Sequence, residues 1–368
     1  MSLRIAGMGW VTPLGSGLGH VWNRLLKGDI AAAESVSSPL GRDYPVFRVP
    51  AEATAQAPAH PRLRRSSAIS RFAVVAGLAA LEDGKLKLDA ETAPRTALVF
   101  AVSNGGVVYT KRFYHEIVES GAQAASPLLF PETVFNAPAS HLAAILGISG
   151  ASYTLVGDGA VGVLALKMAE DLMESEALDQ CLVVGAEEAD WLLCDAYRKW
   201  RLLRPAPPIE PFRQPPRGMI LSEGAGAVLL SRSGPVDVEM ISPGTNFGKQ
   251  REAGGAVGKT LAEVCDDETD LVVASANGTF IDEAERVAVA EKCARARVYT
   301  MKPALGESVG ASGLWQTICA AQALQTQLTP PVSYPGTDNG ERLRKAVVSV
   351  CGLNQQVAGL RLALPRPA

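Results

Sequence analysis

Short apolar runs punctuated by Gly or Asn alternate along the chain with segments in which apolar residues recur at helical spacing. An unbroken apolar run of about four to eight residues is typical of a strand buried on both faces, and recurrence every three to four residues is typical of an amphipathic helix. The alternation predicts an α/β chain with largely buried sheets. The expected strands are 3–8, 96–102, 153–156, 181–185, 224–231, 271–274, 298–301, 346–351 and 357–364. The expected helices are 70–81, 106–119, 140–146, 162–174, 282–294 and 313–325.

One internal similarity bears on the domain organisation. LVFAVSNGG at 98–106 aligns without gaps with LVVASANGT at 271–279, and each segment is an apolar strand ending in Asn-Gly, at Asn104 and Asn277. The match suggests duplication, with related halves at 1–235 and 236–368, although two buried strands can also resemble one another by coincidence.

A proline-rich stretch, RPAPPIEPFRQPPRG at 204–218, separates two of these patterns. Proline fixes φ and the segment has no helical period, so we expect a stiff surface excursion. It leads into MILSEGAGAVLLS, a strand whose glycines allow close approach of other atoms.

Length and charge narrow the class. A chain of 368 residues exceeds the size of a single core, about 250 to 300 residues, which favours two cores or two fused halves. The net charge is −3 and Lys and Arg are scattered, so no nucleic-acid partner is expected. The first segment, 1–15, fits a strand rather than a signal sequence, and no apolar window is long enough to span a bilayer. We therefore expect a soluble cytoplasmic protein without membrane contact.

The residues that bind metals or form disulfides are sparse. Cysteines occur at 181, 194, 265, 293, 319 and 351 without CxxC spacing, which predicts reduced, buried thiols and neither a disulfide framework nor a metal site. No cofactor motif was found. The four histidines, at 20, 60, 115 and 141, all precede residue 142.

The segment YTLVGDGAVGVLALKMAEDLM at 153–173 fits a buried strand, a turn of small residues and an amphipathic helix. Such a turn often carries a nucleophile, because the free amides and the dipole at the start of the helix stabilise an anion. Here the turn, 157–160, contains two Gly, one Asp and one Ala, and no Ser, Thr or Cys.

Six segments in order carry a family resemblance: IAGMGWVTPLGSG, FPETVFNAPASHLAAILGISGASYTL, SEGAGAVLL, ANGT, KPALGESVGASG and VCGLN. Together they resemble the β-ketoacyl synthases of the thiolase fold over nearly the whole chain. The resemblance implies two related halves in a five-layered αβαβα arrangement.

The family's catalysis, as the resemblance implies it, uses a Cys at the strand-to-helix turn and two His residues on later loops. The thiolate attacks an acyl thioester, and the imidazoles stabilise the oxyanion and the enolate formed on decarboxylation. Aligned with this sequence, the Cys position is Gly159, the first His is Asn277 and the second is Glu307, while Lys302 is retained. No catalytic residue is therefore expected, and the site is interpreted as degenerate.

Two carboxylates near these positions were considered as substitutes. Asp158 precedes Gly159, but an anion stabilised at a helix N-terminus is a poor nucleophile, and bonding within the loop is the favoured interpretation. Glu307 is a possible base, yet a base without a nucleophile completes no mechanism. Its expected role is to hydrogen-bond Asn277 or a backbone amide in a closed pocket.

One branch of the family resembles this chain in lacking the Cys: the chain-length factors, which are the non-catalytic β-subunits of type II ketosynthases. Their partners are a catalytic ketosynthase, with which they form a heterodimer, and through it an acyl carrier protein. Gly159 departs from the Gln of the aromatic-polyketide members. The chain is more similar to the smaller polyene or aryl-polyene type.

The resemblance also assigns an interface, formed by the strand before the turn and by the helix within 105–120. Val107, Thr110 and Tyr114 stand at i, i+3 and i+7 and are expected to line the wall of an acyl tunnel. Phe113 and Tyr109 lie off that stripe and are candidate anchors for the partner. Packing of the stripe into the chain's own core is the alternative.

A second part of this interface is assigned to FPETVFNAP. Phe130, Phe135 and Asn136 correspond to the seam near the partner's acyl pocket, with ordinary packing as the competing view. Asn136 is expected to bond across a tight turn ahead of Pro138.

Three functions remain open from the sequence. The first is a chain-length factor that pairs with an active ketosynthase and shapes the tunnel during decarboxylative elongation of carrier-bound chains; it is not expected to be an active enzyme by itself. The second is a stand-alone homodimeric acyl-binding or scaffold protein. The third is an enzyme of altered chemistry that uses Asp158 or Glu307.

Overall fold

The fold is organised around one large mixed sheet. The computed structural model describes residues 3–175, 178–331 and 342–366. Ten strands of the described chain lie in the order β13-β12-β14-β15-β10-β1-β9-β7-β5-β6. They are β1 (Leu3–Thr12), β5 (Thr96–Val102), β6 (Ser152–Val156), β7 (Gln180–Glu187), β9 (Gly224–Ser231), β10 (Val236–Ile241), β12 (Leu271–Val273), β13 (Arg297–Tyr299), β14 (Lys345–Cys351) and β15 (Gln356–Ala363). The short strands β2 (Gly15–Ser16) and β11 (Thr245–Asn246) pair with β1 and β15.

The sheet consists of two five-stranded blocks with the same topology. When the strands of each block are numbered along the chain, both blocks have the order 3-2-4-5-1, with strands 2, 3 and 4 parallel and strands 5 and 1 antiparallel to their neighbours. The blocks meet at the antiparallel pair β1–β10. The similar segments 98–106 and 271–279 contain β5 and β12, each the second strand of its block. This shared order supports our proposal that the chain is duplicated near residues 235–236, just before β10.

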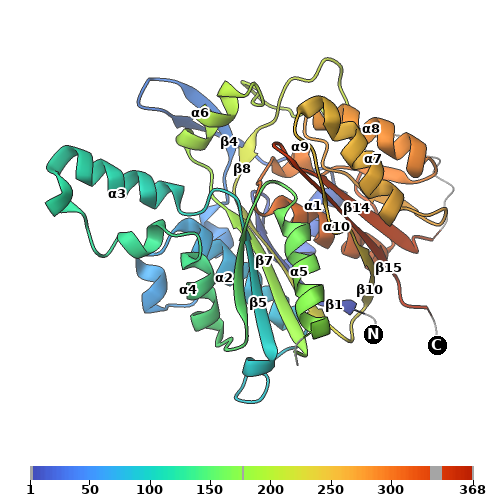
Figure 1. The fold of residues 1–368 in the computed structure, drawn as a ribbon, viewed down its shortest axis with the longest axis horizontal. Helices are drawn as coiled ribbons and strands as arrows, with labels where there is room; N and C mark the ends of the chain where they lie inside the picture. Colours follow the sequence, from blue (N-terminus) through green and yellow to red (C-terminus); the bar gives the residue numbers. More distant parts are fainter. Residues whose placement is uncertain (1–2, 176–177, 332–341, 367–368) are drawn as a thin grey trace.

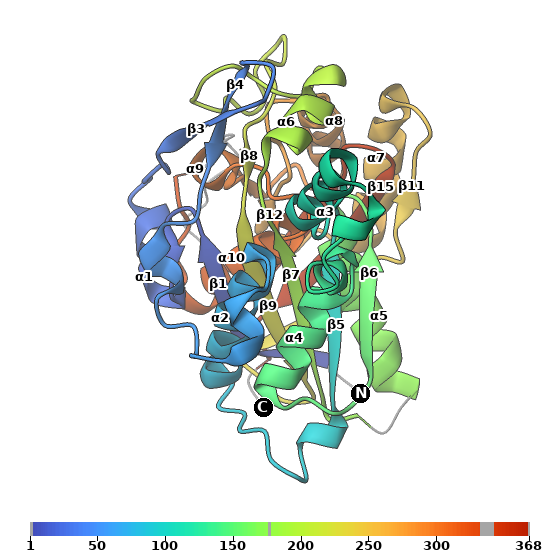
Figure 2. The same ribbon diagram turned by 90° about the vertical axis from the view of Figure 1, so that its left-hand side faces the viewer.

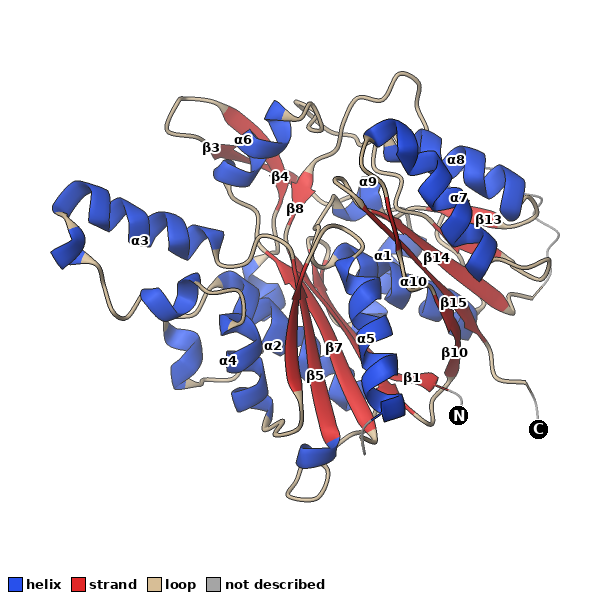
Figure 3. Ribbon diagram, viewed as in Figure 1, coloured by secondary structure: helices blue, strands red, loops and turns tan. Residues whose placement is uncertain are grey.

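Helices cover and separate the two blocks, giving five layers. The helices α2 (Ala68–Asp83) and α4 (Ala137–Leu146) cover the N-terminal block, and α7 (Ala253–Val264) and α8 (Ile281–Lys292) cover the C-terminal block (Figure 1). Between the blocks lie α5 (Val161–Ser175) and α10 (Ser312–Thr326), and α10 packs against both β7 and β9 on one side and β12 and β14 on the other. The predicted α/β architecture is confirmed (Figure 3).

The central helix α10 is buried around nearly its whole circumference, as expected for a helix between two sheets. The indole Nε1 of Trp315 donates to the carbonyl oxygen of Ala225 at 2.8 Å. The side-chain amide of Gln316 donates to Val273 and Ser349 carbonyl oxygens in the C-terminal block. A single helix thus ties its polar groups to both halves.

The predicted strands and helices are all present, with ends shifted by up to four residues, and β5 and β9 have the predicted bounds. Several further elements were not predicted. They are α1 (Leu18–Leu26), α6 (Trp191–Lys199), α7, α9 (Lys302–Leu305), β10 and a small sheet of β3 (Ala33–Ser37), β4 (Asp43–Phe47) and β8 (Leu221–Ser222). Short 3₁₀ turns are η1 (Ala51–Thr54), η2 (Pro61–Arg64), η3 (Ala93–Arg95), η4 (Ala122–Ala124), η5 (Phe130–Thr133) and η6 (Gln250–Glu252). α7 escaped prediction because its sequence, AGGAVGKTLAEV, carries three helix-weakening glycines.

One helix projects away from the layered body. α3 (Val107–Ser120) extends outward from the end of β5, and the chain returns to the body through η4 and η5 (Figures 1 and 2). None of its residues is buried. We call α3 together with residues 121–136 the arm.

The cysteine prediction was wrong for two residues. Cys265 and Cys293 form a disulfide, whereas Cys181, Cys194, Cys319 and Cys351 are free and buried. Cys265 and Cys293 directly follow α7 and α8, so the packing of these helices brings together residues 28 positions apart in sequence. Sequence spacing carries no sign of this contact.

The proline-rich stretch 204–218 runs over the surface beside α8, as predicted. The Phe212 amide donates to the Asp282 carboxylate at 2.6 Å, and the Gly218 amide donates to the Gly278 carbonyl oxygen at 2.7 Å. The stretch therefore covers the start of α8 and the loop before it. Among the described helices, none combines the length and apolar character needed to cross a bilayer.

Candidate functional site

The turn between β6 and α5 has the shape of a nucleophile site but little room for a side chain. Gly159 is buried, and a Cβ placed on it would lie 3.2 Å from the Cα of Gly352. That distance is shorter than an ordinary van der Waals contact. The loop 352–356 has closed over the position that the resemblance assigns to a Cys.

Asp158 holds this loop in place. Its Oδ1 accepts the amides of Gly159 at 2.5 Å and Leu353 at 2.9 Å. Its Oδ2 accepts the amides of Asn354 at 2.8 Å and Gln355 at 2.9 Å. The Gln356 amide also donates to Oδ2, at 3.3 Å. The loop-bonding interpretation of Asp158 is confirmed, and a carboxylate engaged by five amides has no free lone pair directed at a substrate.

The two remaining degenerate positions, Asn277 and Glu307, form one buried chain of hydrogen bonds with the retained Lys302. Lys302 Nζ donates to Glu307 Oε1 at 2.7 Å, and Asn277 Nδ2 donates to Glu307 Oε2 at 2.7 Å. Asn277 Oδ1 in turn accepts the hydroxyl of Thr279 at 2.7 Å. Lys302, Glu307 and Asn277 are exposed by 1%, 4% and 0%. The predicted contact between Glu307 and Asn277 is confirmed.

This network explains why Glu307 is a poor base. Each carboxylate oxygen accepts a charged or amide donor, and the charge is neutralised by Lys302 inside the protein. A buried ion pair of this kind is retained because breaking it leaves an isolated charge in a region of low dielectric constant.

A pocket of about 340 Å³ opens on the other side of the turn. Its wall includes Tyr197 and Trp200, whose rings meet edge to face with centroids 5.5 Å apart. Its floor is formed by Gly157, Asp158 and the loop 353–356. Gly159, Asn277, Lys302 and Glu307 do not line it. This pocket was not predicted, because the helix α6, which carries Tyr197 and is followed directly by Trp200, was not predicted.

The residues assigned to a tunnel wall do not share one environment. Val107 is half-buried and packs against the core around α6 and α7, and the Thr110 hydroxyl donates to the Thr133 carbonyl oxygen at 3.4 Å. Tyr114, one turn further out, is 62% exposed. The ring of Phe113 lies 5.8 Å from that of Phe130. Only the base of this stripe therefore packs within the chain.

The residues assigned to the seam lie on the returning segment of the arm. Phe130 and Phe135 are 57% and 44% exposed, although the Phe135 ring leans against Gly105. Asn136 occupies the N-cap position of α4, but its side chain makes no capping bond, so the expected side-chain bond across the turn is absent. Pro138 in the first turn of α4 already limits the number of amides that need a partner.

Acidic residues at the end of β7 seat the base of the arm. Glu187 accepts the amides of Ser103 and Asn104 at 2.9 and 3.0 Å, and Glu188 accepts that of Val108 in the first turn of α3. Burial raises the pKa of Glu187 to about 8 and that of Glu188 to about 7. These groups therefore gain protons near neutral pH.

A charged contact fastens the arm from the side. Lys111 Nζ donates to Asp190 at 2.6 Å and lies 5.2 Å from the centroid of the Trp191 ring. The hydroxyl of Tyr109 donates to the Ser66 carbonyl oxygen at 3.2 Å, so Tyr109 anchors the arm to its own chain. The base of the arm is fixed, and its outer half is free of contacts that bury it.

The strand before the turn lies at an edge of the sheet. β6 pairs only with β5 in the described sheet, and Tyr153 and Val156 on it are 41% and 53% exposed. An edge strand presents unpaired amides and carbonyls that readily pair with another chain. Edge and arm thus lie at the same end of the N-terminal block (Figure 2).

Comparison with known proteins assigns the chain to a family and a fold. The family profile described as "Beta-ketoacyl synthase, N-terminal domain" matches residues 2–234. The 3-oxoacyl-[acyl-carrier-protein] synthase 2 of Coxiella burnetii is 22% identical over 370 residues, covering 91% of this chain and 89% of the relative. The protein of the same description from Rhizobium meliloti is 24% identical, covering 89% and 87%.

Solved structures show the same fold. A chain of "The ishigamide ketosynthase/chain length factor" superposes with a TM-score of 0.86 at 19% identity and covers 99% of both chains. A chain of "Ketosynthase (ApeO) in Complex with its Chain Length Factor (ApeC) from Xenorhabdus doucetiae" gives a TM-score of 0.81 at 19% identity, covering 99% of this chain and 98% of that one. At this identity the likeness concerns the fold alone.

Proposed function

Because the chain belongs to the β-ketoacyl synthase family, we propose that it is a non-catalytic chain-length factor of the smaller polyene or aryl-polyene type. In this role it pairs in the cytoplasm with an active ketosynthase and shapes the tunnel in which carrier-bound acyl chains are elongated. The observation that carries the proposal is the Lys302–Glu307–Asn277 network, which satisfies its own polar groups at the positions where a synthase needs two imidazoles.

The condensation requires groups that this chain does not place at the turn. A synthase needs a thiolate to hold the acyl group and neutral imidazoles to stabilise the enolate. Gly159 offers neither a nucleophile nor space for one, and Asp158 is engaged by the loop it anchors. In the proposed complex the partner supplies the whole reaction.

The exposed surface supports a pairing role. The edge strand β6 and the arm each carry exposed apolar residues: Tyr153 and Val156 on the strand, and Tyr114, Val118 and Phe130 on the arm, each more than a third exposed. Exposed apolar residues of this kind are typical of surfaces that bind another chain. Obligate pairs of subunits typically bury about 2,000 to 5,000 Å².

Pairing and chain-length control can be tested together. We expect co-expression with the ketosynthase encoded nearest to this chain to give a one-to-one complex by size-exclusion chromatography, active on carrier-protein-bound substrates. Tyr114→Ala in that complex should lengthen the products, because Tyr114 projects from the arm and is free to enter a tunnel shared with the partner. His115→Ala, on a different face of α3, is the matched control and should leave product length unchanged.

Two outcomes would contradict the proposal. A chain that ignores the ketosynthase and forms its own stable homodimer would favour the acyl-binding or scaffold function, with the 340 Å³ pocket as the ligand site. Turnover of acyl thioesters by the isolated chain, lost in Glu307→Gln, would favour an enzyme of altered chemistry.

A further inference from the structure

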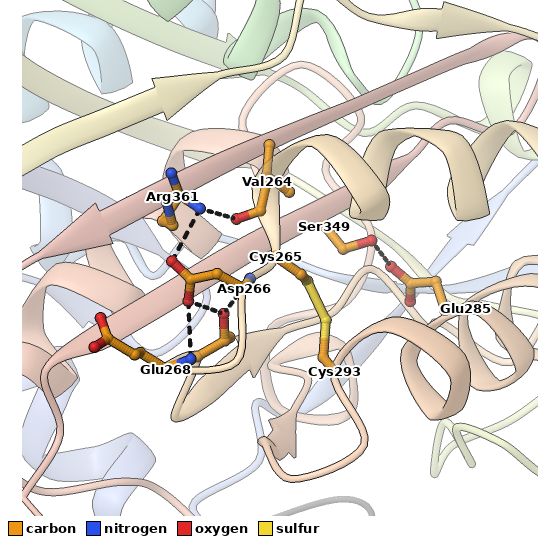
Figure 4. Close-up of a disulfide and its surroundings, with 9 residues drawn as sticks. Val264, Cys265, Asp266, Glu268, Glu285, Cys293, Ser349 and Arg361 are labelled. Atoms are coloured by element: carbon orange, nitrogen blue, oxygen red, sulfur yellow. Dashed lines mark hydrogen bonds and ion pairs between the residues drawn. A yellow bond between two sulfur atoms is a disulfide. The ribbon is translucent and has the colours of Figure 1, made fainter.

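The disulfide lies at one end of a helix whose other end organises the degenerate loop. Cys265 follows α7 and Cys293 follows α8, and both helices lie on the outer face of the C-terminal block (Figure 4). At 1.5 Å per residue, the 12 residues of α8 span about 18 Å. The disulfide at the C-terminal end of α8 can therefore affect the loop 277–279 at the other end of the helix.

The start of α8 holds the loop 277–279. Asp282, in the first turn, accepts the amides of Asn277 at 2.8 Å and Gly278 at 3.0 Å. The same carboxylate accepts the Phe212 amide of the proline-rich stretch. A shift of α8 would thus move both Asn277 and the segment that covers it.

The middle of α8 is held by a half-satisfied carboxyl group. Glu285 Oε1 accepts the hydroxyl of Ser349 at 2.6 Å and that of Ser275 at 2.9 Å, whereas its Oε2 is buried without a partner. Burial raises the pKa of Glu285 to about 7. A buried oxygen without a hydrogen-bond partner becomes more stable when water reaches it. A displacement of α8 that exposes Glu285 Oε2 to water is therefore opposed less strongly than one that breaks only satisfied hydrogen bonds.

The two cysteines differ in access. Cys293 is 5% exposed, while Cys265 is half-buried and begins a loop in which Asp267 and Glu268 are exposed. We therefore expect a thiolate from solution to attack at Cys265 rather than at Cys293. The other four cysteines are buried and unpaired; Cys293 is buried as they are and differs from them in being linked.

We infer that the Cys265–Cys293 bond is a reversible modification site for a dithiol reductant, and that its state sets the order of the 277–279 loop through α8. Reduction begins when one thiolate of the reductant attacks Cys265 Sγ, forming a mixed disulfide and releasing Cys293 as a thiolate that takes up a proton. The second thiolate of the reductant then attacks the reductant sulfur that is bonded to Cys265. This step closes a disulfide within the reductant and releases Cys265 as a thiolate, which takes up a proton. Two electrons pass to the protein, and the reductant leaves as a disulfide.

This inference does not rest on the proposed function, because its readout is the order of the chain itself. The full chain is purified without reductant and treated with iodoacetamide before and after mild dithiothreitol. We expect no label before and two labels after, at Cys265 and Cys293. Labelling of both cysteines before reduction would show that the bond does not form and would overturn the inference.

Hydrogen exchange followed by mass spectrometry tests the transmission. Reduction should speed exchange at least tenfold in peptides covering 275–285, with β5 unchanged. Cys265→Ser should reproduce the reduced pattern without reductant, and Cys293→Ser serves as the second variant if the first folds poorly. Cys194→Ala, which removes a free thiol in α6, should behave as the wild type. Faster exchange confined to 264–270 and 291–297 would overturn the inference.

Discussion

The buried network and the arm treat polar and apolar groups in opposite ways. In the network, Lys302, Glu307 and Asn277 are at most 4% exposed and bind one another. In the arm no residue of α3 is buried, and Val118 is 78% exposed. The polar side chains of the network bind one another, at positions where a synthase needs groups free to act on substrate. The apolar side chains of the arm face solvent, although a chain that remains a monomer normally buries such side chains. This contrast is what the proposed pairing role leads us to expect.

The largest expected effect breaks the network. Glu307→Ala leaves the Lys302 ammonium buried without its counter-ion, and we expect unfolding free energy to fall by about 3 to 5 kcal/mol. Urea denaturation of the isolated chain or of the complex measures it. The double variant Lys302→Met with Glu307→Leu removes both charges and should recover much of the loss. A loss of less than about 1 kcal/mol for Glu307→Ala would mean that Lys302 and Glu307 do not form a buried ion pair in the folded chain.

The next effect concerns the loop over the turn. Asp158→Ala removes the acceptor of five backbone amides and should cost about 2 to 3 kcal/mol, because those donors are partly withdrawn from water. Exchange of the amides of 353–356 should accelerate. Asp267→Ala, at an exposed position, is the matched control and should change stability by less than about 0.5 kcal/mol.

Buried carboxyl groups at the base of the arm and in α8 predict that the stability of the folded chain depends on pH. The folded-state pKa values of Glu187, Glu188 and Glu285 are raised from 4.5 to about 8, 7 and 7, so the folded chain binds more protons than the unfolded one between these limits. Stability is therefore highest on the acid side of this window and falls as pH rises from 5 to 8, by at most about 1.4 kcal/mol per pH unit for each group. Glu187→Gln should flatten the fall between pH 7 and 8. An unchanged slope in that variant would exclude Glu187 as its source.

The smallest effect on stability should accompany a large effect on pairing. Val118→Asp and Phe130→Asp lie on the exposed arm, so each should change the unfolding free energy by about 0.5 kcal/mol or less. Each should weaken binding to the ketosynthase at least tenfold, measured by analytical ultracentrifugation. Glu119→Gln, also on the arm, is the control. Undiminished pairing in both aspartate variants would remove the arm from the interface.

Part of this comparison could be predicted and part could not. The strands β5 and β9 have the expected bounds because an unbroken apolar run between Gly and charged residues has few alternative registers. The contact between Glu307 and Asn277 followed from the order of the motifs. The environment of Tyr114 did not, because helical spacing places residues on one face without showing whether that face meets the body or solvent.

Long-range contacts account for the other misses. The Cys265–Cys293 bond depends on two helix ends that meet only after the C-terminal block has formed. The wall of the pocket depends on α6, a nine-residue helix in which Tyr197 lies near the end and which Trp200 directly follows. In both cases the residues can be read from the sequence, but their contacts depend on how distant elements pack in the folded chain.

The loop anchored by Asp158 also limits which substitutions the turn accepts. A substitution of Gly159 by Cys meets the Gly352 backbone, and any side chain at Gly352 would meet the Asp158 carboxylate, 2.2 Å from its Cβ position. A side chain at position 159 therefore requires the loop to move by a few tenths of an ångström. A return to the residues that the resemblance assigns to a synthase would also require new residues at 277 and 307. The anchor thus makes the present shape of the turn difficult to leave by single substitutions.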